Sequence, residues 1–365
     1  MELININMCA IEVYTLEQSV MWKDIVEKFR FCDVYYLPEY VKAFEVHGDG
    51  CPLLIYYKSD TLCGINVVVR RDIADIPFFS QFIKHNKYFD YITPYGYGGW
   101  LFSGGITEDN ISVFCIEYKK FCELNNIICE FIRFHPLVHN VNYLRNYIEI
   151  VDLGDTISLN LDSQELIWNN MTSKNRNVIK KAQKNGVKIY SSKDVSLIDD
   201  FMKIYNATMI RDSANKYYYF SRDFYESIFR DLKNNFDLFY AKYEDKIIAV
   251  SIIIYYGEYV HYHLSGSLFE YRYLAPTNLL LYEVACRFCD LGYKKFHLGG
   301  GVGSGNDNLY RFKKSFNRNF TNQYSIGKII YDMACYNQLV TFCKDYDSNF
   351  NMESSFFPLY RNLNI

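Results

Sequence analysis

The sequence lacks long hydrophobic runs. Its longest apolar run, IIAVSIIIYY at residues 247–256, is about half the length that a membrane-spanning helix needs, and it has the composition of a strand. The opening residues, MELININMCAIEVYTLEQ, contain no basic segment followed by an apolar one, which is the pattern of a signal peptide. We therefore expect a chain without a transmembrane segment that acts in the cytoplasm.

The sequence also lacks the cysteine patterns of disulfide-rich or zinc-binding proteins and the glycine motifs of nucleotide-binding proteins. The 11 cysteines are an odd number scattered among apolar residues, which favours reduced thiols over a disulfide framework. CRFC at 286–289 is a lone C-x-x-C, whereas a zinc ribbon needs a second pair. GGGVGSG at 299–305 fits neither G-x-G-x-x-G nor G-x-x-x-x-G-K-[ST]. The sequence therefore does not predict a zinc ribbon or a common nucleotide-binding fold.

Apolar and aromatic residues, by contrast, are plentiful. They make up 50% and 18% of the chain, which is typical of a globular protein, and a length of 365 residues favours two domains over one core. The net charge of −3 argues against a surface that binds nucleic acid over its whole extent, but it is compatible with a local basic patch.

An internal repeat supports two domains. YKSDTLCGINVVV at 57–69 aligns without gaps with KYEDKIIAVSIII at 242–254, and each predicts a strand, a tight turn and a second strand. FCELNNIICEFIRF at 121–134 resembles FCDLGYKKFHLGG at 288–300, and each predicts the end of a helix followed by a strand. Each half thus carries a hairpin, a strand, a helix and a strand in the same order. This order predicts a duplicated α/β unit with a mixed sheet.

The segment between the two halves is strongly basic. From Leu166 to Lys193 there is no acidic residue. Such an unbalanced charge suits an anionic ligand, for example a nucleotide diphosphate, a lipid pyrophosphate or RNA, and it is also compatible with a solvated helix face. The seven basic residues are Lys174, Arg176, Lys180, Lys181, Lys184, Lys188 and Lys193.

The glycine-rich stretch precedes a second basic cluster. It follows a predicted strand, KKFHL at 294–298, and a predicted helix begins near Asp307. The glycines either expose amides that bind an anion at the helix N-terminus or let the backbone approach a substrate beside a lysine. Helical spacing puts Lys313 at the edge of the apolar face and turns Lys314 toward solvent. Lys313 is therefore the candidate for stabilising a developing oxyanion or a phosphate.

Histidines and tyrosines provide further candidates. VHYHLSGS at 260–267 predicts His261 and His263 on one face of a strand, and His297 lies on another strand. Together they could bind zinc, but because no carboxylate stands at ligand spacing we predict no metal site and consider His263 and His297 as acid–base groups. Tyr217 and Tyr219 of NKYYYF are expected to line the cleft.

Several of these stretches resemble the FemABX-like branch of the GNAT acyltransferase superfamily, which includes the peptidoglycan cross-bridge peptidyltransferases. The resemblance is carried by SKNRNVIKKAQKNGVKI (173–189), LAPTNLLLYEVACRFCDLGYKKFHLGGG (274–301), LYRFKKSF (309–316) and EFIRFHP (130–136). It implies two GNAT-like domains in tandem and transfer of an acyl or aminoacyl group to an amine. It also implies that acyl-CoA or aminoacyl-tRNA is a co-substrate, with no permanently bound cofactor.

The resemblance also assigns residues. The family's Phe-Lys pair matches Phe312 and Lys313, and its basic helix matches Arg176, Lys180 and Lys181. The pyrophosphate loop of acyl-CoA enzymes, [QR]-x-x-G-x-[GA], is absent from the equivalent stretch. Our candidate catalytic residues are Lys313, His263 and His297, and our candidate substrate-binding residues are Arg176, Lys180, Lys181, Tyr217, Tyr219, Gly300, Gly301, Asp307 and Phe312.

We accordingly expect three parts. Residues 1–162 form a first GNAT-like domain on which the tail 331–365 packs back, residues 163–193 form a basic connecting helix, and residues 194–330 form a second domain with the active cleft. The expected function is acyl or aminoacyl transfer to an amine of a cell-wall or surface-polysaccharide precursor that is nucleotide- or lipid-linked. tRNA and the membrane surface are further candidate partners. The alternative is a non-catalytic module that binds a glycan or a nucleotide.

Overall fold

The structure, a computed structural model, describes residues 10–363 and divides into two compact units. Within that range, unit 1 takes residues up to 31, then 35–152 and the chain from 325 onward, and unit 2 takes residues 32–34 and 153–324. Two of these boundaries fall inside strands β7 and β13, and each strand is described below with the unit that holds most of it. The basic segment 163–193, expected as a connection, therefore belongs to unit 2, and the tail from 331 belongs to unit 1.

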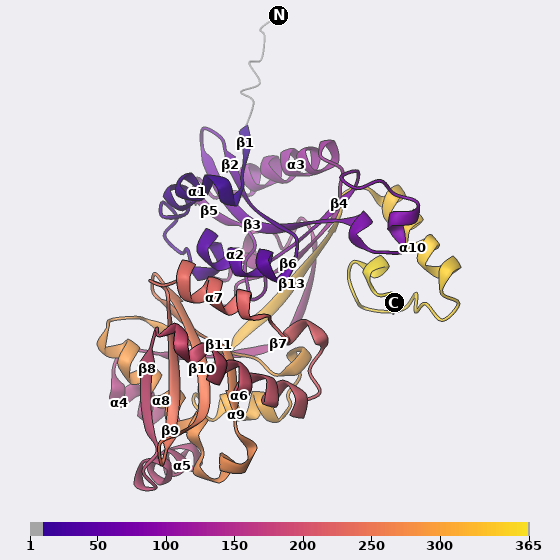
Figure 1. The fold of residues 1–365 in the computed structure, drawn as a ribbon. Helices are drawn as coiled ribbons and strands as arrows, with labels where there is room; N and C mark the ends of the chain where they lie inside the picture. Colours follow the sequence, from indigo (N-terminus) through magenta and orange to yellow (C-terminus); the bar gives the residue numbers. More distant parts are fainter. Residues whose placement is uncertain (1–9, 364–365) are drawn as a thin grey trace, which may run out of the picture. The chain divides into compact units, whose positions relative to one another are not determined.

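Unit 1 contains a mixed sheet in the order β1-β2-β3-β4-β6-β13, with β5 beside β3 (Figure 1). β4 and β6 are parallel, whereas β2, β3 and β4 form an antiparallel series. The elements are β1 (Ala10–Tyr14), α1 (Ser19–Val26), α2 (Pro38–His47), β2 (Cys51–Lys58), β3 (Leu62–Asp72), β4 (Phe89–Ile92), β5 (Leu101–Gly104), α3 (Glu108–Leu124), β6 (Ile127–Arg133), β13 (Asn322–Ile330) and α10 (Met333–Tyr346).

Unit 2 contains a second mixed sheet in the order β7-β12-β11-β10-β9-β8, in which β11 and β12 are parallel. Its elements are β7 (Glu149–Asn160), α4 (Gln164–Asn170), α5 (Ser173–Lys184), β8 (Lys188–Ser192), α6 (Ile198–Arg211), α7 (Arg222–Asp231), β9 (Phe236–Tyr243), β10 (Lys246–Tyr256), β11 (Tyr259–Ser267), α8 (Pro276–Asp290), β12 (Lys295–Gly299) and α9 (Asn308–Lys314).

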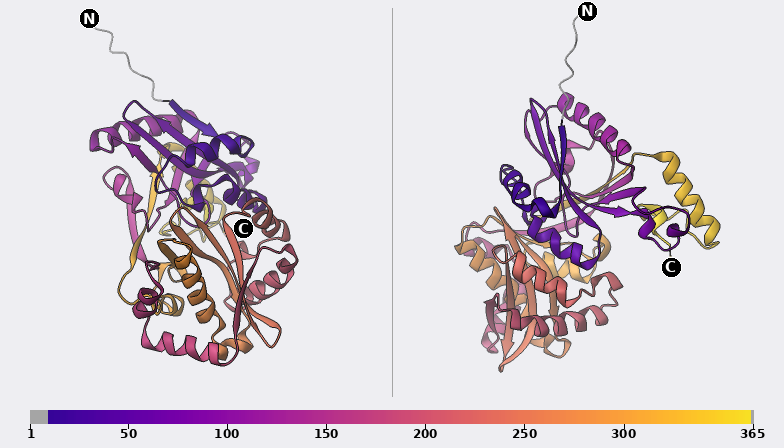
Figure 2. Two further views of the ribbon diagram at one scale, coloured as in Figure 1. Left: turned by 90° about the vertical axis from the view of Figure 1, so that its left-hand side faces the viewer. Right: turned by 45° about the horizontal axis from the view of Figure 1, so that its top comes forward.

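The two faces of the second sheet are covered by different helices (Figure 2). Ala249 and Ile253 of β10 lie in one core with α4, α5 and α8. Gly266 of β11 pairs with the intervening Val250 and so faces the other side, where a Cβ atom would come within 2.8 Å of the α6 backbone at Ile204. α6 thus packs its backbone directly against β11, and only glycine leaves room for it.

The same topology occurs in both units. In unit 1 the order is β2-β3-β4-α3-β6, with the short strand β5 inserted before α3 and paired with β3. In unit 2 the order is β9-β10-β11-α8-β12. Each is an antiparallel series followed by a helix and a parallel strand. Asp60 lies in the turn between β2 and β3, and Asp245 lies in the matching turn between β9 and β10. The predicted duplication and the mixed α/β class are therefore confirmed.

The duplication includes a strand exchange that the sequence does not reveal. β7 follows β6 along the chain, yet it pairs with β12 in unit 2. β13 follows β12, yet it pairs with β6 in unit 1. Each half of the chain thus contributes one strand to the sheet of the other half: β7 to the sheet of unit 2, and β13 to the sheet of unit 1.

A buried ionic network ties the C-terminal tail to unit 1. Asp90 of β4 is fully buried and accepts hydrogen bonds from Arg71 Nε at 2.6 Å, Arg361 Nε at 2.5 Å and the Tyr360 hydroxyl at 2.8 Å. Burial raises the pKa of Asp90, but the two guanidinium groups outweigh burial and hold the pKa below its usual value. The carboxylate therefore remains ionised at neutral pH and holds the tail in place.

Candidate functional site

Lys313 of α9 is buried beside the glycine-rich loop. Its side chain is 8% exposed, and its Nζ donates a hydrogen bond to the Gly300 carbonyl oxygen at 2.6 Å. Burial lowers the pKa of Lys313 to about 8, against the opposing charge of Asp307. An ammonium has three N–H donors, and the hydrogen bonds among the described residues use one of them. Lys313 therefore combines a positive charge, a low-dielectric setting and capacity for another acceptor.

The glycine loop is closely folded back on itself. A Cβ atom on Gly301 would come 2.1 Å from the Gly305 carbonyl oxygen, and one on Gly154 of β7 would come 1.9 Å from that of Ser304. Asp307 caps α9, because its Oδ1 accepts from the Tyr310 amide at 2.8 Å, and its Oδ2 accepts from the Val302 amide at 3.0 Å. These hydrogen bonds lower the pKa of Asp307, and the one from the Tyr310 amide has the largest effect.

This geometry decides between the two roles proposed for the glycines. An anion at the start of α9 would compete with the carboxylate of Asp307, which already accepts the available amides. The glycines instead allow close approach of backbone to backbone and present the Gly300 carbonyl to Lys313. The loop is therefore better suited to positioning the lysine than to cradling a phosphate.

Polar contacts join α9 to the starts of α5 and α8. The Ser315 carbonyl oxygen, just after α9, accepts from the Thr172 amide at 2.9 Å and from Asn175 Nδ2 at 3.4 Å. Asn278 Nδ2 of α8 in turn donates to Asn175 Oδ1 at 2.8 Å. Sequence reasoning missed this pair of asparagines, although each stands in the first turn of its helix, where a polar side chain has backbone groups to bind.

The residues flanking Lys313 have structural contacts. Phe312 is half-buried and packs edge-on against Phe316, with ring centres 5.4 Å apart. Lys314 is half-exposed, and its Nζ donates to the Phe320 carbonyl oxygen at 3.2 Å. Lys313 is thus the more buried of the two lysines and Lys314 the more exposed, as their helical spacing predicts.

The histidines lie where β11 and β12 run side by side. Pairing of the two strands extends from Tyr259 and Lys295 to His261 and His297, whose rings are 5.5 Å apart. The β10 residues Ile252 and Ile253 pair with Leu264 and Tyr262, so His263 is the extra residue of a bulge. The regular alternation that would place His261 and His263 on one face is therefore broken.

The protonation states of these histidines follow from their surroundings. Burial, and then the neighbouring His261, lower the pKa of His263 to about 3, so this ring is neutral at physiological pH. A neutral imidazole can accept a proton but cannot act as the acid. Within the described residues, His261, His263 and His297 do not offer ligand atoms within 4.8 Å of one another.

An acidic residue that sequence reasoning missed binds His261. Asp33 belongs to unit 2, and its Oδ2 lies 2.6 Å from His261 Nε2, with both side chains buried. The two residues are 228 positions apart in the sequence, and no local motif surrounds Asp33. Only the folded chain brings them together.

The basic helix α5 divides into a structural and a solvent-exposed part. Arg176 Nη1 donates to the carbonyl oxygens of Met171 at 2.6 Å and Trp168 at 3.4 Å, so this guanidinium closes the end of α4. Lys180 and Lys181 are exposed. Among the described residues, no carboxylate forms an ion pair with any of the exposed lysines of this segment, which are Lys174, Lys180, Lys181, Lys184 and Lys188.

Tyr217 and Tyr219 lie in the connection between α6 and α7. Tyr217 is half-buried and contacts Phe220 with ring centres 6.0 Å apart, whereas Tyr219 is 37% exposed. Lys313, Gly300, Gly301, Asp307 and Phe312 thus come together in one loop and helix, and His297 lies on the strand that leads into that loop. The lysines of α5 and the two tyrosines lie on other elements of unit 2.

Three comparisons place the chain among known proteins. Residues 171–314, all within unit 2, match the family described as "Acetyltransferase (GNAT) domain". The chain is 28% identical over 178 residues to the UDP-N-acetylmuramoylpentapeptide-lysine N(6)-alanyltransferase of Weissella viridescens, and the match covers 46% of this chain and 50% of the relative. The chain therefore spans about half the length of the curated relative that it matches.

Solved structures agree on the fold. The crystal structure of FemX matches with a TM-score of 0.65 and 11% identity, over 90% of this chain and 99% of that chain. A conserved protein of unknown function from Bacteroides thetaiotaomicron matches with a TM-score of 0.56 and 12% identity, over 88% and 99% of the two chains. The sequence matches and the shared fold together confirm the predicted resemblance to the FemABX-like branch of the GNAT superfamily.

Proposed function

We propose that the chain transfers an acyl or aminoacyl group to an amine of a cell-wall precursor. The observation that carries this proposal is the buried ammonium of Lys313, held on the Gly300 carbonyl at the start of a GNAT-type loop and helix. The alanyltransferase to which the chain is similar acts on the lysine of a UDP-linked muramoyl pentapeptide, and this supports a lysine amine as acceptor and an aminoacyl donor.

The proposed chemistry assigns a role to each group. The acceptor amine attacks the carbonyl carbon of the donor ester or thioester, and the carbonyl oxygen becomes an oxyanion. When this intermediate collapses, the bond from the carbonyl carbon to the donor oxygen or sulfur breaks, and the leaving group departs as an alcohol or thiol with the proton that the amine gives up. The Lys313 ammonium stabilises this oxyanion, and such electrostatic stabilisation is strongest where water is excluded. His263 and His297 are the candidates for taking the proton of the amine. Of the two, His263 is the poorer base, because burial lowers its pKa to about 3.

Where acyl-CoA enzymes carry their pyrophosphate loop, this chain has the end of β11, a short helical turn at Phe269–Leu274 and the start of α8. A screen of acyl-CoAs and aminoacyl-tRNAs against UDP-linked and lipid-linked muramoyl pentapeptides tests the proposal. We expect an aminoacyl donor to give product, and no product from any pair would overturn the assignment.

The exposed lysines of α5 give a separate prediction. Reversing the charges in Lys180→Glu/Lys181→Glu should weaken binding of the UDP-linked precursor by roughly tenfold at low salt, because both ammonium groups attract the anion from solvent. The loss should shrink at high salt, where screening already weakens the wild type. Isothermal titration calorimetry measures both affinities.

The matched control is Lys203→Glu/Lys233→Glu, which reverses two exposed charges elsewhere in unit 2. The control should retain wild-type affinity. Equal losses in the two double variants would mean that overall charge matters and that α5 does not bind the precursor.

The pKa of Lys313 predicts a pH dependence with a definite sign. With a pKa of about 8, Lys313 is a cation below that pH and neutral above it, so its stabilising charge is lost as the pH rises through 8. Because the acceptor amine also ionises, the informative quantity is the ratio of the wild-type rate to that of Lys313→Arg, whose guanidinium stays charged. This ratio should fall above pH 8. A ratio that rises there would indicate that Lys313 acts as a base.

A further inference from the structure

A groove runs beside α8, between this helix and the segment formed by α4, α5 and β8. It consists of two adjoining cavities of about 350 Å³ and about 640 Å³ that share Gln164, Gln183 and Tyr282. Both volumes fall within the range of about 300–1,000 Å³ that is typical of ligand pockets. The residues that line the groove all belong to unit 2, and none of them is among the groups assigned to the transfer chemistry apart from Lys180 at its edge.

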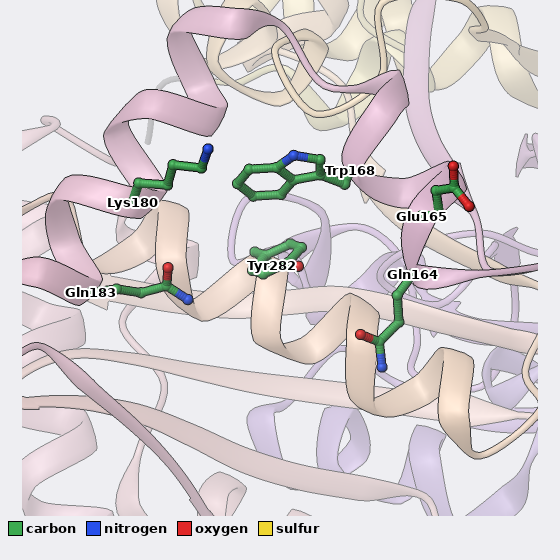
Figure 3. Close-up of a pocket in the computed structure, with 6 residues that line it drawn as sticks. All are labelled: Gln164, Glu165, Trp168, Lys180, Gln183 and Tyr282. Atoms are coloured by element: carbon green, nitrogen blue, oxygen red, sulfur yellow. The ribbon is translucent and has the colours of Figure 1, made fainter.

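Two aromatic rings, inclined to each other, provide apolar surface in the groove (Figure 3). Trp168 of α4 and Tyr282 of α8 are half-buried, with ring centres 5.2 Å apart and planes inclined by 60°. The Lys180 ammonium lies 5.5 Å from the centre of the indole ring. The aromatic pair is thus fixed by packing while part of each ring stays open to solvent.

Amides surround the two rings. Gln183 of α5 lies on one side and Gln164 of α4 on the other, as Figure 3 shows, and both are exposed. Each amide offers a donor and an acceptor, and so it can pair with a hydroxyl group, which also does both. Gln164 Nε2 is already oriented by a hydrogen bond to Asp290 Oδ1 at 2.8 Å.

The groove carries charges of both signs, with one more carboxylate than cations. Glu165, Glu283 and Asp290 line it together with Lys180 and Arg287, so its walls carry three carboxylates and two cations. The carboxylates at the walls repel a polyanion. The ligand chemistry that fits is uncharged, rich in hydroxyl groups and flat on one side.

We propose that this groove binds a neutral oligosaccharide. A pyranose ring presents one face of C–H groups, which packs on the electron-rich face of Trp168 or Tyr282, and its rim of hydroxyls pairs with the amides and carboxylates. Together the two cavities offer room for more than one sugar unit. Binding needs neither donor nor amine, so the inference goes beyond the proposed transfer and stands independently of it.

Tryptophan fluorescence tests the proposal directly. Of the three tryptophans, Trp22 and Trp100 are buried with 0% and 1% exposure, so Trp168 in the groove reports ligand contact. The full chain is titrated with a panel of neutral tetrasaccharides built from glucose, galactose, mannose and N-acetylglucosamine. We expect saturable binding of at least one member, with an affinity that does not change with salt because the ligand is uncharged.

Variants locate the binding. Gln183→Ala, which removes one exposed amide, should weaken the affinity by about tenfold, and Gln338→Ala, at an exposed position of α10 in unit 1, should leave it unchanged. Calorimetry with Trp168→Ala should show loss of binding. The proposal is overturned if no tetrasaccharide binds, if Gln183→Ala binds as well as the wild type, or if a single-stranded RNA oligonucleotide binds in their place with an affinity that falls with salt.

Discussion

Replacing Lys313 with alanine should lower the turnover number by about a hundredfold or more. Removing one donor that stabilises an oxyanion typically costs two to three orders of magnitude in rate, and Lys313 Nζ is buried where such a charge is most effective. Because the lost interaction forms in the transition state, kcat should fall while KM for the acceptor changes little. Steady-state kinetics with the donor and acceptor identified by the screen measures both.

Lys314→Ala is the matched control, since this side chain is half-exposed and bonded to the Phe320 carbonyl. It should lose less than about fivefold, which corresponds to roughly 1 kcal/mol. Small and equal effects of the two substitutions would mean that α9 has only a structural role.

The loss of activity in Lys313 variants should not come from unfolding. The folded pKa of about 8 lies below the value of about 10.4 expected for an unfolded chain, so the folded state binds fewer protons between these values. At neutral pH the buried ammonium therefore reduces stability. Lys313→Met should melt no lower than the wild type at pH 7, and any advantage should disappear as the pH rises from 8 toward 10. A lower melting temperature at pH 7 would contradict this reasoning.

Replacing Asp90 with alanine should destabilise unit 1 by about 3–5 kcal/mol. The substitution leaves Arg71 and Arg361 close together without the carboxylate that they share, and uncompensated buried charge has this cost. The Tyr360 hydroxyl also loses its acceptor, so the C-terminal tail should detach. Thermal or urea unfolding measures the first effect, and limited proteolysis near the tail measures the second.

The pH dependence of this contribution follows from the depressed pKa of Asp90. The carboxylate stabilises the fold fully above its unfolded pKa of about 3.9, and the contribution is lost as the pH falls below that value toward the folded pKa. Asp345→Ala, at an exposed position of α10, is the control and should change stability by less than about 0.5 kcal/mol. Comparable losses in both variants would show that the network is not what holds the tail.

Local sequence patterns predicted the repeated hairpins and the helix that begins after Asp307. Strand, turn and helix signals act over a few residues, so the β2–β3 and β9–β10 hairpins and the cap of α9 could be predicted from the sequence. Helical spacing, which is also local, likewise predicted that Lys314 is more exposed to solvent than Lys313.

Features that depend on distant parts of the chain could not be predicted in this way. Alternation along a strand assumes regular pairing, and the bulge at His263 depends on how β10 lies beside β11. The role of Arg176 depends on the end of α4, whose carbonyls it binds, and Asp33 reaches His261 only in the folded chain. The strand exchange between the halves likewise has no local signal.

The nature of the bond formed on the acceptor tests the central claim most directly. The wild-type chain, an isotope-labelled aminoacyl-tRNA and UDP-linked muramoyl pentapeptide are incubated together, and the precursor is then analysed by mass spectrometry before and after treatment with alkaline hydroxylamine, which cleaves esters. We predict a mass increase of one aminoacyl residue on the lysine that survives the treatment, because the product is an amide. A precursor that binds but never gains mass with any donor, or gains only a hydroxylamine-sensitive label, would contradict amide-forming transfer.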